Sequence, residues 1–219
     1  MEKYIIIGNS EHAFTMNNYI MSTDFGQVIA FAVDSEYVGD GEFCGKSVIS
    51  LEELEEKYSS EEVKLIMGIG YKKMGNIKKN IFTRCKKMGY SFENYIHPSA
   101  IVSRDAILGE GNNILDGVII ESGVEMGDGN ILFAGSIMGH DTKVGSFNTF
   151  SIKSIVAGCV EIGNNCMCGI NSTIKDHIII NDYALIGATA YAQHDIEEYE
   201  VLVSAKSYIL EGKKSTDFL

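Results

Sequence analysis

The chain has 219 residues and a formal net charge of −12, from 18 Lys and Arg against 30 Asp and Glu. This balance argues against the basic surface that binds nucleic acid or an anionic membrane. No apolar run approaches the ~18 residues of a membrane span, and residues 4–7 are too short a run for a signal peptide. We expect a cytoplasmic protein of one or two domains, which agrees with five cysteines that show no disulfide-like framework.

Residues 1–95 alternate short apolar runs with helical patterns. We expect strands at residues 3–7, 28–33 and 63–67. We expect helices from the His12 region to residue 21, over 51–58, and from the segment after Gly70 to residue 88. Elements of these lengths in this order predict a small doubly wound, Rossmann-like α/β domain.

Three residues in this domain follow the expected strands directly: Gly8, Asp34 and Gly70. Ligands of such domains bind beyond the carboxyl ends of the strands. Each residue alone has a structural explanation, because a glycine can form a turn and an aspartate can cap a helix. Together they favour a binding site. The segment after the first strand is not a GxGxxG motif, so a dinucleotide cofactor is not expected.

From Val102 to Ile186 an apolar residue recurs at every sixth position. A second period of eighteen places glycine after four of these residues, at 109, 127, 145 and 163. Neither a helix nor a strand explains these periods, whereas three six-residue sides that close into one coil do. We predict a parallel β-helix over residues 96–190, starting near Pro98, the single proline, and a cap or tail over 191–219.

His140, which Asp141 follows, is the best candidate for acid–base chemistry. A histidine changes charge near neutral pH, and a carboxylate partner strengthens it as a general base, although a lone histidine is usually structural. Neighbours on a flat strand point to opposite faces, so the pair can meet only at a coil corner or across subunits. We expect no metal site, because Cys166 and Cys168 both fall on inward positions.

These segments together resemble the hexapeptide-repeat sugar acetyltransferases. That group contains sialic acid O-acetyltransferases and N-acetyltransferases of nucleotide-linked amino sugars. The resemblance covers nearly the whole chain. It rests on residues 5–12, Asp34, 68–70, 96–100, His140-Asp141, 157–163 and 186–188.

The resemblance implies a left-handed β-helix, an exception to right-handed crossovers, and a homotrimer with acetyl-CoA bound between the β-helices of neighbouring subunits. It implies that His140 is the general base and that Asp141 tunes it. For such a reaction we expect the Gly158 N–H to stabilise the oxyanion. Coenzyme A would contact Thr149, Gly158, Ile170 and Ala188. The nucleotide sugar would contact Gly8, Ser10, Glu11, His12, Asp34, Ser35 and Gly70.

The chain departs from the family pattern at three places. Glu11 replaces the usual glycine before the loop histidine, and Thr149 replaces a histidine of some members. Ser204-Ala205-Lys206 stands where the family has a Pro-Ala-Lys ending. The expected activity is acetyl transfer from acetyl-CoA to the amino group of a nucleotide-linked amino sugar. The alternatives are O-acetylation of a sialic-acid-like sugar and a non-catalytic sugar-binding scaffold.

Overall fold

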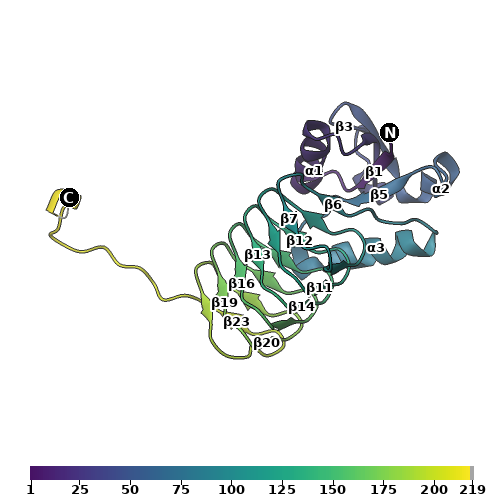
Figure 1. Cartoon of the computed structure of the whole chain (residues 1–219). Coiled ribbons are helices and arrows are strands. Elements are labelled where there is room, and N and C mark those ends of the chain that lie inside the picture. Colours follow the sequence, from purple (N-terminus) through teal and green to yellow (C-terminus); the bar gives the residue numbers. More distant parts are fainter. Residues whose placement is uncertain (218–219) are drawn as a thin grey trace.

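The computed structural model describes residues 1–217, and it shows an α/β domain that adjoins one end of a parallel β-helix (Figure 1). Residues 218 and 219, the end of the predicted cap or tail, lie outside the described residues. The N-terminal sheet has the order β3-β4-β2-β1-β5 and is parallel except for β3. Its strands are β1 (Lys3–Ile7), β2 (Gln27–Val33), β3 (Glu42–Phe43), β4 (Lys46–Ser50) and β5 (Lys64–Met67).

Helices cover both faces of this sheet. Helix α1 (Glu11–Ser22) packs on the face that carries Tyr4 and Ile6, and α3 (Asn76–Lys87) packs on the face that carries Ile5 and Ile7. Shorter helical segments are η1 (Ser35–Tyr37), η2 (Leu51–Glu53), α2 (Leu54–Lys57) and η3 (Lys72–Gly75). The predicted α/β domain is therefore confirmed, with each expected strand in place.

Strands β3 and β4 were not predicted from the sequence. The apolar run in β4 is short, since Lys46 and Ser47 precede Val48 and Ile49. This segment becomes a strand because its main chain pairs with the edge of β2, from Phe31 to Val33. Pairing of this kind leaves little trace in the local sequence.

Two-residue strands form the three sides of the coil. The first side contains β7 (Ile101–Val102), β10 (Ile119–Ile120), β13 (Ile137–Met138), β16 (Ile155–Val156), β19 (Thr173–Ile174) and β22 (Tyr191–Ala192). The second contains β8 (Ile107–Leu108), β11 (Glu125–Met126), β14 (Lys143–Val144), β17 (Glu161–Ile162) and β20 (Ile179–Ile180). The third contains β6 (Tyr95–Ile96), β9 (Asn113–Ile114), β12 (Ile131–Leu132), β15 (Thr149–Phe150), β18 (Met167–Cys168), β21 (Leu185–Ile186) and β23 (Val201–Leu202).

Each strand from β6 to β19 pairs in parallel with the strand eighteen residues later, as Ile119 pairs with Ile137 and Ile137 with Ile155. The last pair, β21 with β23, joins Leu185 to Val201 and is two residues shorter. The second residue of each strand points inward, and from Ile114 to Ile186 these residues are at most 5% exposed. The predicted repeat is confirmed. The coil continues beyond residue 190 through β22 and β23, where Ala192 fills the inward position with a smaller side chain.

Helix α3 lies along the corner between the second and third sides and fastens the two domains together (Figure 1). Tyr183 Oη donates to Asn76 Oδ1 (2.9 Å), and the Phe82 and Phe147 rings are 5.5 Å apart between centroids. Lys78 is fully buried in this contact, and burial lowers its pKa to about 7.

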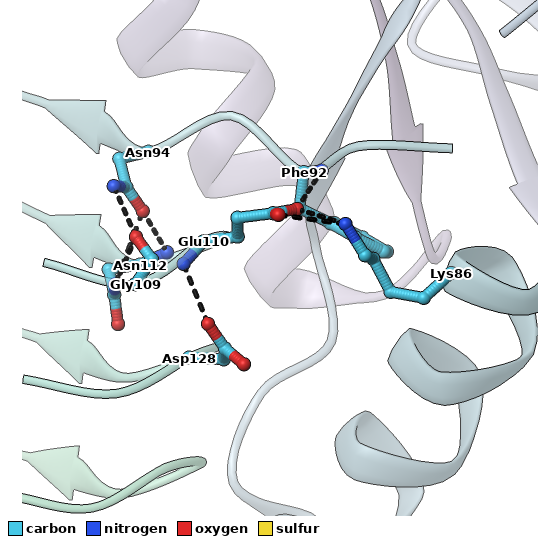
Figure 2. Close-up of polar contacts among 7 residues, drawn as sticks. All are labelled: Lys86, Phe92, Asn94, Gly109, Glu110, Asn112 and Asp128. Atoms are coloured by element: carbon cyan, nitrogen blue, oxygen red, sulfur yellow. Dashed lines mark hydrogen bonds and ion pairs between the residues drawn. The ribbon is translucent and has the colours of Figure 1, made fainter. Parts of the chain in front are cut away.

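Glu110 forms the polar link at the start of the coil (Figure 2). Its carboxylate accepts from Lys86 Nζ at 2.7 Å and from the Phe92 N–H at 3.1 Å, while its own N–H donates to Asp128 Oδ1 at 2.8 Å. Nearby, Asn94 Oδ1 accepts from the Asn112 N–H at 2.8 Å. The corner is thus hydrogen-bonded both to the α/β domain and to the next coil.

Beyond Leu202 the chain leaves the coil as an extended segment (yellow in Figure 1), on which Tyr208 is 83% and Ile209 is 90% exposed. Among the helices of residues 1–217, none is long and apolar enough to cross a bilayer.

Phe150→Ala tests the packing of the coil. Phe150 is fully buried, so its truncation leaves a cavity and should lower the free energy of unfolding by about 3–5 kcal/mol. Denaturant unfolding followed by circular dichroism measures this loss. Ile107→Ala is the control, because Ile107 is 65% exposed and should change stability by about 0.5 kcal/mol or less. Equal losses in both variants would contradict the inward assignment of Phe150.

Candidate active site at a coil corner

His140 and Asp141 lie in the turn between β13 and β14, where the first side of the coil meets the second. Asp141 has the left-handed backbone conformation, with φ of 55°. This turn brings adjacent side chains together, and His140 Nδ1 is 2.9 Å from Asp141 Oδ2. The pair therefore forms within one chain at a coil corner, which is one of the two arrangements that the sequence allowed; the other was a contact across subunits.

The preceding coil holds this turn in place. The His140 N–H donates to Glu121 Oε2 at 2.8 Å, and the Asp141 N–H donates to Ser122 O at 2.9 Å. Glu121 was missed in the sequence analysis. The eighteen-residue period could have identified it, because Glu121 lies one coil earlier in the turn that corresponds to the turn of His140.

The environment of His140 favours its charged form. The hydrogen bond to Asp141 raises the pKa of the imidazole above its ordinary value of 6.5, and the charges of Asp141 and Glu121 add to the effect. Burial acts in the opposite direction but does not reverse it. Because the side chain is 59% exposed, a ligand at the surface can reach it.

Gly158 lies directly against the imidazole from the following coil. A Cβ atom built at Gly158 would be 2.5 Å from His140 Nε2, so any side chain at this position would displace the ring. When Asp141 accepts a hydrogen bond from Nδ1–H, the neutral ring presents Nε2 as a proton acceptor. The corner thus holds the His140 imidazole in a fixed orientation as a base, with the main chain of Gly158 beside it.

Ile170 and Ala188 lie at the opposite edge of the first side, in the turns before β19 and β22. Both are exposed and line a groove of about 400 Å³ that Tyr71 and Phe133 also border. Thr149 is 2% exposed in β15, on the third side. One chain therefore does not bring the four predicted coenzyme A residues together: Gly158 contacts His140, while Ile170 and Ala188 share the distant groove.

The predicted sugar-nucleotide residues do gather in the α/β domain. Strand β1 lies between β2 and β5, so the loops after these strands are neighbours. A Cβ atom at Gly8 would be 3.0 Å from Gly68 O, and one at Gly70 would be 3.6 Å from His12 Cβ. Ser10, Glu11 and Ser35 are exposed at the same strand ends.

Two of these predicted residues already have partners. Asp34 Oδ1 is 2.6 Å from Arg84 Nη1, a residue of α3 that the sequence analysis missed. His12 is 8% exposed, with Nε2 2.9 Å from Asn113 Nδ2 of the coil. Burial, with a smaller effect of Lys78, lowers the pKa of His12 to about 3. His12 is therefore neutral and joins the two domains.

Three cysteines bear on metal binding. Cys166 and Cys168 are buried as predicted, and burial raises the pKa of the Cys166 thiol to about 12. Cys159 is half-buried in the turn after Gly158, next to His140 and Asp141. The Cys-x-Cys spacing does not include Cys159, and its signal is the eighteen-residue period, which stacks it on Asp141.

No family model matches the chain, and no curated protein matches it. Solved structures do. PerB from Caulobacter crescentus, in complex with CoA and GDP-perosamine, is 24% identical with a TM-score of 0.80, over 92% of this chain and 93% of that chain.

The acetyltransferase domain of PglB from Neisseria gonorrhoeae is 23% identical with a TM-score of 0.79, over 92% of this chain and 96% of that chain. WeeI from Acinetobacter baumannii is 16% identical with a TM-score of 0.78, over 93% of this chain and 97% of that chain. At these identities the likeness establishes the fold. The predicted fold class, an α/β domain followed by a left-handed parallel β-helix, is confirmed.

The His140–Asp141 pair predicts a measurable pKa shift. NMR titration of the His140 ring should give a pKa above 6.5, since Asp141 stabilises the imidazolium. The neutral base then predominates only at a pH above this raised value. Asp141→Asn removes the charge and should lower the pKa of His140. A wild-type pKa at or below that of the variant would contradict this coupling.

Proposed function

We propose that the protein transfers an acetyl group from acetyl-CoA to the amino group of a nucleotide-linked amino sugar. The observation that carries this proposal is the exposed imidazole of His140, held by Asp141 and placed against the main chain of Gly158. The fold supports it, because PerB has CoA and GDP-perosamine bound and the PglB domain has been solved with acetyl coenzyme A. A perosamine N-acetyltransferase from Caulobacter crescentus has the same fold.

In the proposed mechanism, the amine nitrogen of the sugar attacks the thioester carbonyl, and His140 Nε2 accepts a proton from this amine. A C–N bond forms, and the Gly158 N–H donates to the developing oxyanion. Collapse of the tetrahedral intermediate breaks the C–S bond, and the proton on His140 passes to the departing thiolate. Asp141 stabilises the imidazolium between these steps. The direct transfer requires no covalent enzyme intermediate.

We assign sugar-nucleotide binding to residues 1–95. The main chain from Gly8 to Ser10 leads into the N-terminus of α1, where peptide N–H groups favour phosphate. Asp34 and its partner Arg84 lie at the end of β2, where they can recognise a base or ribose. Glu11 is exposed beside this loop, and its charge opposes a phosphate that approaches too closely.

We propose a homotrimer in which neighbouring copies share each site. The outer row of the first side is apolar and exposed, with Ile101 64%, Ile155 40% and Tyr191 50% accessible. An exposed apolar row of this kind marks an interaction surface. A second copy packed there would bring the Ile170–Ala188 edge of one subunit towards the His140 corner of its neighbour. We also propose a cytoplasmic location, where thiols stay reduced.

The second candidate is O-acetylation of a sialic-acid-like sugar. Glu11 favours it, because a free sugar acid places no pyrophosphate beside this carboxylate. The same base could remove a proton from a hydroxyl. A non-catalytic scaffold is disfavoured, because such a protein has no need of the His140–Asp141 pair.

Product analysis separates these candidates. We expect acetyl-CoA and a panel of UDP-, GDP- and dTDP-linked amino sugars to yield one acetylated nucleotide sugar by mass spectrometry. The product should survive mild alkali because an amide resists conditions that cleave an ester. An acetyl group lost to alkali would identify O-acetylation and contradict the amine assignment.

His140→Ala tests the catalytic residue. We expect turnover to fall by about 10²–10⁴-fold, the usual cost of losing a general base, while acetyl-CoA binding is retained. His177→Ala is the matched control, because His177 lies two coils further on beside Asp176, at a distance of 3.8 Å. Steady-state kinetics and calorimetry measure the two effects. Turnover of His140→Ala within about threefold of wild type would exclude His140 as the base.

A further inference from the structure

Cys159 occupies the turn position of Asp141, one coil further on. Both residues have the left-handed conformation, with φ of 58° and 55°. The Cys159 N–H donates to His140 O at 2.8 Å, so the two turns stack in register. As a result, one ring nitrogen of His140, one carboxylate oxygen of Asp141 and Cys159 Sγ all lie within 4.8 Å of one another.

We propose that His140, Asp141 and Cys159 form an inhibitory site for a divalent transition metal, with Zn²⁺ as the best fit. Zinc binds imidazole nitrogen, thiolate sulfur and carboxylate oxygen, and a site with three protein ligands leaves the fourth position to water. Thiolate and imidazole together favour zinc over Mg²⁺ or Ca²⁺, which prefer oxygen ligands.

The geometry needs little adjustment. Bond lengths of ~2.0–2.3 Å in a tetrahedral site put ligand atoms roughly 3.3–3.8 Å apart. His140 Nδ1 and Asp141 Oδ2 are 2.9 Å apart, and the ion would replace the proton that they share. The two side chains are 59% and 67% exposed, so they can rotate towards Cys159 without disturbing the core.

Glu121 strengthens the site from outside the ligand set. Its carboxylate accepts the His140 N–H at 2.8 Å and so fixes the backbone of the ligating residue while adding negative charge nearby. Outer groups of this kind orient ligands and raise metal affinity.

A metal ion on His140 would inhibit acetyl transfer, because the imidazole that serves as base is then held as a ligand. This inhibition rests on the proposed function, whereas binding of the ion does not. The two parts can therefore be tested separately.

Cobalt titration tests the binding. Co²⁺ replaces Zn²⁺ in such sites, and a thiolate ligand gives it a charge-transfer band. We expect chelator-treated wild type to bind one Co²⁺ per chain with this band, and Zn²⁺ to displace it. Cys159→Ser should lose the band. Cys44→Ser is the matched control and should keep it, since Cys44 is also half-buried but lies between β3 and β4.

Absence of the band in wild type, or its persistence in Cys159→Ser, would overturn the proposed site. Zinc should also inhibit wild type and Cys44→Ser reversibly, and Cys159→Ser should need about tenfold more zinc or higher for the same inhibition. Equal zinc sensitivity of all three proteins would overturn inhibition through this site. A chain that binds cobalt as expected but acetylates no sugar would refute the proposed function and leave the metal site standing.

Discussion

Each side of the coil takes six residues, and the rest of the structure depends on this fixed count. Because three sides close one coil, the residues from β6 to β22 stack on the residues eighteen positions away, as Ile137 does on Ile119. Parallel hydrogen bonds hold the coils in register, and one residue more or less in a side would move later inward side chains out of the core. The same constraint places Gly158 against His140 and Cys159 beside Asp141.

The sequence predicts most of this fold, because a period of six or eighteen has few physical explanations. It predicts less well where pairing rather than pattern decides the structure. Strand β4 forms on the edge of β2 from a run with only Val48 and Ile49 at its apolar centre. The coil likewise continues past residue 190. There the buried Ala192 takes the inward position, and its small side chain hides the repeat of larger apolar residues from the sequence pattern.

The candidate site was predicted in part. His140 and Asp141 follow from residue chemistry, but their contact depends on the left-handed turn at Asp141. Glu121 and Arg84 are harder to predict because their partners are distant in the sequence: Glu121 binds His140 one coil later, and Arg84 of α3 binds Asp34 at the end of β2. Only the folded chain shows that Gly158 and the Ile170–Ala188 edge lie on opposite sides of one exposed apolar face. This separation is the reason to propose a site shared by two copies.

Subunit complementation tests that claim most directly. His140→Ala disables one edge of the site, and Ala188→Trp would block the other at an exposed position. If each site takes His140 from one copy and the Ala188 edge from its neighbour, co-expressed mixed trimers should regain about a quarter of wild-type activity. With equal amounts of the two variants, half of the chains carry an intact His140 and the other half an intact Ala188 edge. About one site in four then combines the two intact parts. Mixed assemblies no more active than the separate variants would show that the site lies within a single chain, which would contradict the account.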